Sequence, residues 1–148
     1  MTEDIVAIEQ VLYRYCHAVD RGTADEVAAL FHERGTLVPI YSGEAPRQGR
    51  SAIREWYATY MRDFRSTVDH LRHCVASPAI EVSGNEATAR TYLIADCIPK
   101  STGKPVIVAG LYEDRFVKDG GRWYFADRRI HVFHSMEPPK AAQPVAGR

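Results

Sequence analysis

The sequence has 148 residues, and 45% of them are apolar, which is enough for one substantial hydrophobic core but not for a second full domain. Lysine plus arginine and aspartate plus glutamate number 19 each, so no net field favours nucleic acid, an anionic membrane surface or a polyanionic substrate. The partner that we expect is therefore a small molecule or another protein chain.

The N-terminal part of the chain has the apolar spacing of helices. Between residues 3 and 20 the apolar side chains recur at helical intervals, which predicts an amphipathic helix, and Gly22 fits its C-terminal stop. Thr23 followed by Glu26 is the capping-box pattern and predicts a short second helix that forms a tight hairpin with the first. A short strand is expected next, over residues 36–41.

A loop and a third helix follow this strand. Glycines and a proline between residues 42 and 49 predict the loop, and Ser51 is placed to cap the helix. The helix has an unusually aromatic face, which we expect to be mostly core. Its members are Ile53, Trp56, Tyr57, Tyr60 and Phe64.

After residue 66 the period of the apolar side chains falls to two, which is typical of strands. The predicted strands span residues 70–82, 86–98, 105–118 and 122–134. Glycine-containing turns at 83–85 and 119–121 make the first two strands, and the last two, antiparallel neighbours. Helices first and sheet second predict an α+β fold: a cone-shaped α+β barrel in which three N-terminal helices pack on a curved antiparallel or mixed sheet, with a pocket between the layers.

One domain should occupy residues 1–136. Residues 137–148 should be a flexible tail, because their prolines and small residues cannot continue the sheet. No apolar run approaches the roughly 20 residues needed to span a bilayer, and the start of the chain is acidic, unlike a signal peptide. We expect a cytoplasmic protein.

The sequence contains no pattern that predicts a metal or a cofactor. Cys16, Cys74 and Cys97 form no CxxC pair and are typical of buried reduced thiols. Two His-x-x-His pairs begin at His70 and His131, but residues three apart on a strand face opposite sides, so neither pair binds one ion without a bulge. Gly-x-Ser-x-Gly, GxGxxG and Walker sequences do not occur.

Asp20 and His73 are the first candidates for chemistry. Asp20 lies in the last turn of the first predicted helix, where the helix dipole disfavours a carboxylate by up to about 1 kcal/mol. His73 lies early in the first long strand, and a histidine in an apolar pocket, oriented by a carboxylate, is a ready general base. From the residues alone, Asp20 could equally face solvent, and a structural role for His73 is the commoner outcome.

Three further residues are candidates for the pocket wall. Tyr15, on the apolar face of the first helix, could direct its hydroxyl into the pocket, although packing is the commoner role. Asp96 shares a strand face with Tyr92 and Ile94, so it lines the pocket or lies at the surface of the strand end. Arg128 shares its face with mainly apolar residues, which favours an inward guanidinium that clamps an anionic or carbonyl group.

Several short motifs occur along the chain in a particular order. They are residues 13–22, Gly49-Arg50 with Ile53, Arg72-His73, Gly84 with Ala87, Gly110-x-Tyr112-x-Asp114 and Gly121-x-Trp123. Each motif is loose by itself. Together, over residues 3–134, they resemble the SnoaL-like group of the nuclear transport factor 2-like superfamily.

The resemblance implies roles for the candidate residues. In scytalone dehydratase, bile acid 7α-dehydratase and hexachlorocyclohexane dehydrochlorinase, an aspartate that ends the first helix and a histidine at the start of the sheet form the working pair. Asp20 and His73 match these positions. Tyr15 and Asp96 match a tyrosine and a second aspartate of the bile acid enzyme, and Arg128 matches an arginine of the dehydrochlorinase.

These matches imply a cofactor-independent, dehydratase-like lyase or isomerase that acts on a small apolar cyclic molecule, with His73 as base and Asp20 holding its ring. The superfamily also contains non-catalytic domains, so the fold does not choose the function. The alternative is a small-molecule-binding or assembly domain that resembles dioxygenase β-subunits. In either case the open side of the sheet predicts a homodimer, with a trimer as the next choice.

Overall fold

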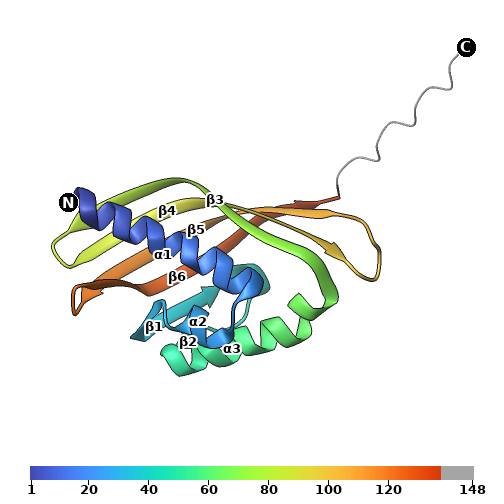
Figure 1. Cartoon of the computed structure of the whole chain (residues 1–148), viewed down its shortest axis with the longest axis horizontal. Coiled ribbons are helices and arrows are strands. Elements are labelled where there is room, and N and C mark those ends of the chain that lie inside the picture. The colour runs from blue at the N-terminus through green and yellow to red at the C-terminus, as the bar shows by residue number, and fades with distance from the viewer. Residues whose placement is uncertain (138–148) are drawn as a thin grey trace, which may run out of the picture.

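Three helices and a six-stranded sheet make up the computed structural model, which describes residues 1–137 (Figure 1). All but the first residue of the predicted tail, 137–148, lie outside the described residues. Among the described residues, no helix combines the length and the apolar character needed to cross a bilayer.

The first two helices form where the sequence predicts them. Helix α1 spans Thr2–Arg21 and is followed by Gly22. Helix α2 spans Ala24–Ala28, and both halves of its capping box are present. Thr23 Oγ1 accepts a hydrogen bond from the Glu26 N–H at 3.2 Å, and Glu26 Oε2 accepts one from the Thr23 N–H at 2.7 Å. The short connection brings α2 against α1, as predicted for a hairpin.

Helix α3, Arg50–Asp63, begins earlier than predicted. Its N-cap is Gly49 rather than Ser51, and no side chain caps it. Gly49 has a φ of 84°, which glycine adopts without steric cost, so the chain can turn there into the helix. The guanidinium of Arg50 donates to the Phe31 carbonyl at 2.8 and 3.0 Å and ties the start of the helix to the sheet.

The sheet is mixed and has the order β2-β1-β6-β5-β4-β3. Its strands are β1 (Phe31–Pro39), β2 (Arg47–Gln48), β3 (Val68–Ser83), β4 (Glu86–Pro99), β5 (Val106–Asp119) and β6 (Arg122–Met136). The four long strands are antiparallel neighbours, as predicted, whereas β1 runs parallel to β6. Strand β1 starts before the predicted strand at 36–41, because a register shift between Phe31 and Thr36 interrupts the alternation there.

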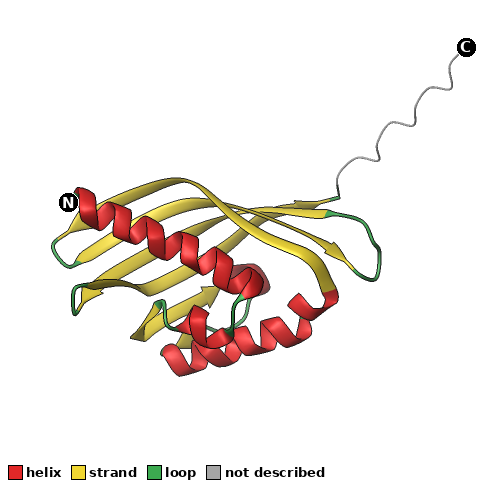
Figure 2. Cartoon of the chain, viewed as in Figure 1, coloured by secondary structure: helices red, strands yellow, loops and turns green. Residues whose placement is uncertain are grey.

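All three helices lie on one side of the curved sheet and leave its other side uncovered (Figures 1 and 2). Helix α1 packs on β3 and β6, and α3 packs on α2 and β1. Strand β4 shows the difference between the sides: Leu93 and Ala95 are buried, whereas Tyr92 and Ile94 are 56% and 49% exposed. This is the predicted cone-shaped α+β fold, with the core between the helices and the inner side of the sheet.

Two bulges interrupt the alternation of β3. One lies at His70 and the other at Ser77, and each gives β3 an extra residue relative to β4. Both residues have a positive φ, 55° and 51°. Between the bulges, Leu71, His73 and Val75 point toward the helices. The bulge at His70 therefore decides which side of the sheet His73 faces.

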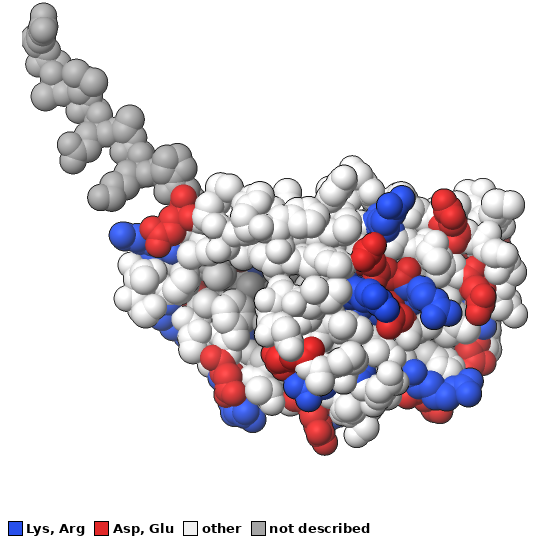
Figure 3. Space-filling model, turned by 180° about the vertical axis from the view of Figure 1, so that it is seen from behind, with Lys and Arg blue, Asp and Glu red and all other residues white. Residues whose placement is uncertain are grey.

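The uncovered side of the sheet has a charged part and an uncharged part (Figure 3). Arg90, Glu113 and Arg129 are cross-strand neighbours on β4, β5 and β6, so a row of alternating charge crosses the sheet. Neighbouring opposite charges of this kind stabilise strand pairing modestly. Tyr92 and Ile94 follow Arg90 on the same side of β4.

Candidate active site

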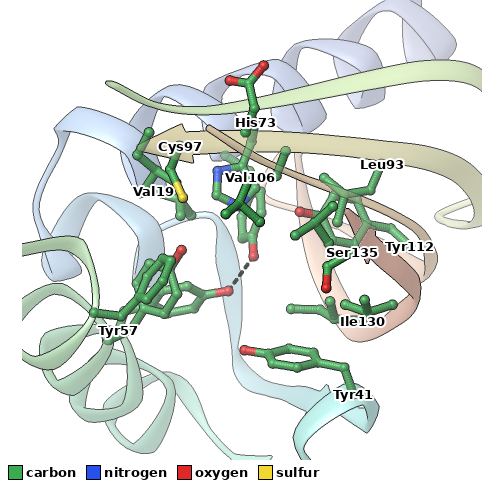
Figure 4. A pocket seen from close by; sticks show the side chains of 18 of the residues that line it. Val19, Tyr41, Tyr57, His73, Leu93, Cys97, Val106, Tyr112, Ile130 and Ser135 are labelled. Carbon is green, nitrogen blue, oxygen red and sulfur yellow. Dashed lines mark hydrogen bonds between the residues drawn. The ribbon is translucent and has the colours of Figure 1, made fainter. Parts of the chain in front are cut away.

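A cavity of about 440 Å³ lies between α1, α3 and the inner side of the sheet (Figure 4). Much of its wall is aromatic and is formed by Tyr15, Tyr41, Trp56, Tyr57, Tyr60, Phe64 and Tyr112. The aromatic face of α3 forms part of this wall instead of filling the core, since only Ile53 and Tyr57 of that helix are buried. No lysine or arginine among the described residues lines the cavity, so the cavity suits a neutral molecule.

Asp20 and His73 meet at the wall of this cavity. The side chain of Asp20, in the last turn of α1, is 3% exposed, so it does not face solvent. One of its oxygens lies 2.5 Å from Nδ1 of His73, and the other accepts the backbone N–H of His73 at 2.9 Å. Asp20 therefore fixes both the backbone and the ring of His73.

The second ring nitrogen of His73 is available to a molecule bound in the cavity. His73 lines the cavity, and its side chain is 11% exposed. Because Asp20 holds Nδ1, any ligand of the ring must use Nε2, and no described residue hydrogen-bonds to that atom. A carboxylate behind one nitrogen and an open cavity before the other is the arrangement of a general base.

Tyr15 and Tyr57 form a second polar contact in the wall. Their hydroxyls are hydrogen-bonded to each other, and their rings meet edge-on with centroids 6.0 Å apart (Figure 4). Burial raises the pKa of both hydroxyls, and the positive charge of Arg128 acts in the opposite direction. Tyr57 was missed as a site residue because its helical spacing indicates packing, and only the fold brings it to Tyr15.

Tyr41 also projects into the cavity, from the turn Ile40–Ser42 (Figure 4). Burial raises its pKa to about 12, so the hydroxyl stays protonated and can donate a hydrogen bond. The sequence contains no signal for this role, since Tyr41 stands at the end of a predicted strand.

Arg128 is buried behind the cavity wall and does not line the cavity. Its guanidinium donates to Asp114 at 2.8 and 2.9 Å, and neither side chain has exposed surface. Three ring centroids, those of Tyr15, Tyr112 and Phe125, lie 4.0, 3.8 and 4.2 Å from the guanidinium carbon. The inward orientation agrees with the prediction, but the predicted clamp on a substrate does not, because Asp114 and the rings enclose the guanidinium.

Asp96 directs its carboxylate away from His73. The carboxylate binds the guanidinium of Arg72 at 2.5 and 3.1 Å, and its side chain is 27% exposed. Ala95 is the register partner of His73, so strand alternation turns Asp96 to the other side, although it touches the rim of the cavity. Of the two predicted positions, the one at the surface of the strand end fits the carboxylate.

The described residues hold no metal-ligating cluster. No group of three or more His, Cys, Asp or Glu side chains with suitable geometry occurs among residues 1–137. A bulge lies within each His-x-x-His pair, so the strand geometry alone does not separate the two histidines. His131, however, is already bound to Glu113 at 2.7 Å.

All three cysteines are free. Cys16 is buried, and burial raises its pKa to about 11, but Cys74 is exposed and Cys97 half-buried, so the prediction of three buried thiols was wrong.

Comparison with known proteins gives one family match. The profile of the family described as SnoaL-like domain matches residues 1–129. No curated protein matches the sequence.

Solved structures of similar fold include proteins with and without an assigned activity. A single-substitution variant of Rv3472, a protein of unknown function from Mycobacterium tuberculosis, has a TM-score of 0.75 and 28% identity over 87% of this chain and 71% of that chain. A Novosphingobium aromaticivorans protein provisionally named scytalone dehydratase has a TM-score of 0.78 and 25% identity over 100% and 99% of the two chains. Hexachlorocyclohexane dehydrochlorinase, LinA type 2, has a TM-score of 0.77 over 97% and 96%, but its 13% identity shows a shared fold alone.

Proposed function

We propose that this chain, which belongs to the SnoaL-like domain family, is a cofactor-independent lyase or isomerase that acts on a small apolar cyclic molecule. The observation that carries the proposal is the Asp20–His73 pair, with the free ring nitrogen of the histidine at the wall of an aromatic cavity. The dehydratase and dehydrochlorinase names among proteins of the same fold are consistent with it.

In this proposal His73 is the catalytic base. With Nδ1–H donated to Asp20, Nε2 carries the lone pair and removes a proton from a carbon atom of the substrate. The electron pair of the broken C–H bond forms a double bond. In an elimination, the leaving group departs with the electron pair of its bond to carbon. In an isomerisation, the existing double bond breaks, and its electron pair forms a new C–H bond at another carbon with the proton that the imidazolium returns. Asp20 is a positioning residue, because it orients the ring and stabilises the imidazolium.

Tyr15 is the proposed donor to an oxygen atom of the substrate. It lines the same cavity as His73, and its hydroxyl already belongs to a hydrogen-bonded pair with Tyr57. Asp96 and Arg128 are not assigned a direct contact with the substrate, because their charged groups are held by Arg72 and Asp114. The absence of lysine and arginine from the described cavity wall favours a neutral substrate, such as a cyclic ketone or alcohol.

Proton removal can be tested without knowing the natural substrate. The protein is incubated in deuterium oxide with small steroids, aromatic diols and cyclic ketones, and hydrogen exchange at carbon is followed by NMR. We expect exchange or turnover of at least one compound, and its loss in His73→Ala with nearly unchanged thermal unfolding. His134→Ala is the matched control, because His134 is an exposed histidine on β6. Retention of the activity in His73→Ala would show that the proposed base is wrong.

The non-catalytic assembly alternative has one observation in its favour. Tyr92 and Ile94 lie exposed on the uncovered side of the sheet, where another chain could cover them. The homodimer stays a prediction, and light scattering at several protein concentrations measures it. Dimerisation through this side leaves the cavity on the other side open, so the two functions are compatible.

A further inference from the structure

The end of α1 carries a carboxylate where the helix disfavours one. Asp20 lies in the last turn, and its side chain is 3% exposed, so little water screens it from the partial negative charges of the last carbonyl groups. The proposed function nevertheless needs an ionised Asp20, because the carboxylate accepts the Nδ1 proton of His73 and stabilises the imidazolium. A cation at the carbonyl end of α1 would offset this cost.

Arg65 supplies a cation at this helix end. Its side chain is half-buried, and its Nη1 donates to the carbonyls of Val19 and Gly22 at 3.1 and 2.8 Å. The two carbonyls belong to residues on either side of Asp20 in the chain. Arg65 therefore binds the segment of backbone from which the Asp20 side chain projects.

The turn between α1 and α2 explains why a side chain bonds to these carbonyls. In a longer helix the Thr23 N–H would bond to the Val19 carbonyl. Here the same N–H donates to Glu26 at 2.7 Å, in the capping box that starts α2. The start of α2 thus removes a backbone donor from the end of α1, and Arg65 takes its place.

The segment that carries Arg65 is itself held in place. It is the 3₁₀ turn Arg65–Thr67, which joins α3 to β3. Lys100, directly after β4, donates its backbone N–H to the Thr67 carbonyl at 3.0 Å and its Nζ to the Ser66 carbonyl at 2.9 Å. Arg65 therefore connects the helix end that carries the carboxylate to the start of the strand that carries the proposed base.

We propose that Arg65 is a positioning residue for the Asp20–His73 pair. Its two hydrogen bonds fix the orientation of the last turn of α1, and its charge offsets the helix dipole at the carboxylate. The role deepens the proposed function and rests on it for the effect on turnover. The effect on the hydrogen bond between Asp20 and His73 can be measured without a substrate.

The first test follows the Nδ1 proton of His73 by ¹⁵N-edited NMR, with the resonance assigned by its loss in His73→Ala. Arg65→Met keeps the apolar stem but removes the cation and both hydrogen bonds. We expect this change to speed the exchange of the Nδ1 proton with water about 10-fold. Arg21→Met is the matched control and should leave the exchange unchanged, because Arg21 is an exposed cation in the same last turn of α1.

The second test uses kcat for the reaction found in the exchange assay. Arg65→Met should lower kcat about 10-fold, which is within the range for a small misplacement of a reacting group. In the Asp20→Asn background the same change should lower kcat by less than about twofold, because the carboxylate on which Arg65 acts is gone. Arg65→Lys should retain most of the wild-type kcat, because a single nitrogen makes both contacts and Lys keeps the cation.

The two tests separate the positioning role from the proposed function. Faster exchange of the Nδ1 proton in Arg65→Met, without turnover of any compound by the wild type, would support the positioning role and contradict the lyase or isomerase. Unchanged exchange in Arg65→Met would overturn the positioning role, and so would equal losses of kcat in the wild-type and Asp20→Asn backgrounds. If Arg65→Met does not fold, Arg65→Gln, which keeps a donor without the charge, replaces it in both tests and should change both quantities in the same direction.

Discussion

Two acid–base pairs, Asp20–His73 and Asp114–Arg128, lie near the same cavity and differ in what they leave free. In both, a carboxylate oxygen lies within 2.5 to 2.8 Å of a nitrogen. His73 keeps a second nitrogen at the cavity, whereas the guanidinium of Arg128 is enclosed by Asp114 and aromatic rings. The first pair can exchange a proton with a bound molecule, and the second can act only through its electric field.

The largest expected effect concerns the pair with the free nitrogen. Asp20→Asn replaces the acceptor of the Nδ1 proton by an amide, which permits the wrong tautomer of His73. We expect kcat for the reaction found in the exchange assay to fall about 10²- to 10⁴-fold. Histidine ¹⁵N chemical shifts should report the changed tautomer, a readout that loss of packing alone would not move. An unchanged tautomer together with unchanged kcat contradicts the positioning role.

The enclosed pair should respond mainly in stability. Asp114→Ala leaves the Arg128 cation buried without a counter-charge, and we expect a loss of about 3–5 kcal/mol in the free energy of unfolding. Urea denaturation measures this loss. Asp20→Ala, which removes two hydrogen bonds but leaves no guanidinium without its partner, should cost about 1–3 kcal/mol. Equal losses in the two variants would mean that the pairs do not differ as described.

A third acid gives a matched exposed pair. Asp96 binds Arg72 on the side of β4 that faces away from His73, and the Arg72 side chain is 64% exposed. Asp96→Asn should change the free energy of unfolding by at most about 1 kcal/mol and leave kcat within about twofold of wild type. A loss of kcat comparable to that of Asp20→Asn would restore Asp96 as a residue of the reaction.

The smallest effect is expected at Asp4, near the start of α1. Its carboxylate accepts hydrogen bonds from Lys118 at 2.8 Å and Trp123 at 2.9 Å, and these bonds lower its pKa in the folded protein. A lowered folded pKa means that the stabilisation is complete above the pKa of the unfolded chain, about 4, and is lost as the pH falls through the folded value. Asp4→Asn should therefore have a lower thermal midpoint than wild type at pH 7, and the difference should shrink below pH 4.

The strongly periodic parts of the chain were predictable. Helix α1, the capping box of α2 and the four long strands follow from local patterns. The parts that depend on distant contacts were not. The spacing of Arg128 indicates only that it points inward, because its partner Asp114 lies on a different strand. For Asp96, alternation could not decide whether the side chain faces the pocket or the surface, and only the strand register decided this.

The site was predictable to the same degree. Asp20 stands out in the sequence because a carboxylate at the C-terminal end of a helix is unfavourable. Its pairing with His73 was predicted from the family resemblance and not from the residues alone. Tyr57 and Tyr41 gave no signal, because an aromatic residue at helical spacing or at a strand end indicates packing equally well. Whether the aromatic face of α3 packs into the core or lines a cavity depends on the distance of the helix from the sheet, which no local sequence pattern predicts.

The bulge at His70 determines which side chains of β3 point toward the helices. With regular alternation from Val68 onward, His70 and Arg72 would point toward the helices and His73 would point away from them, so the ring of His73 could not meet Asp20. His70→Val, which tolerates a positive φ poorly, should favour that second arrangement, whereas His70→Gly should favour the present one. The backbone conformation of this one residue thus determines whether the odd-numbered or the even-numbered side chains of this part of β3 face the interior.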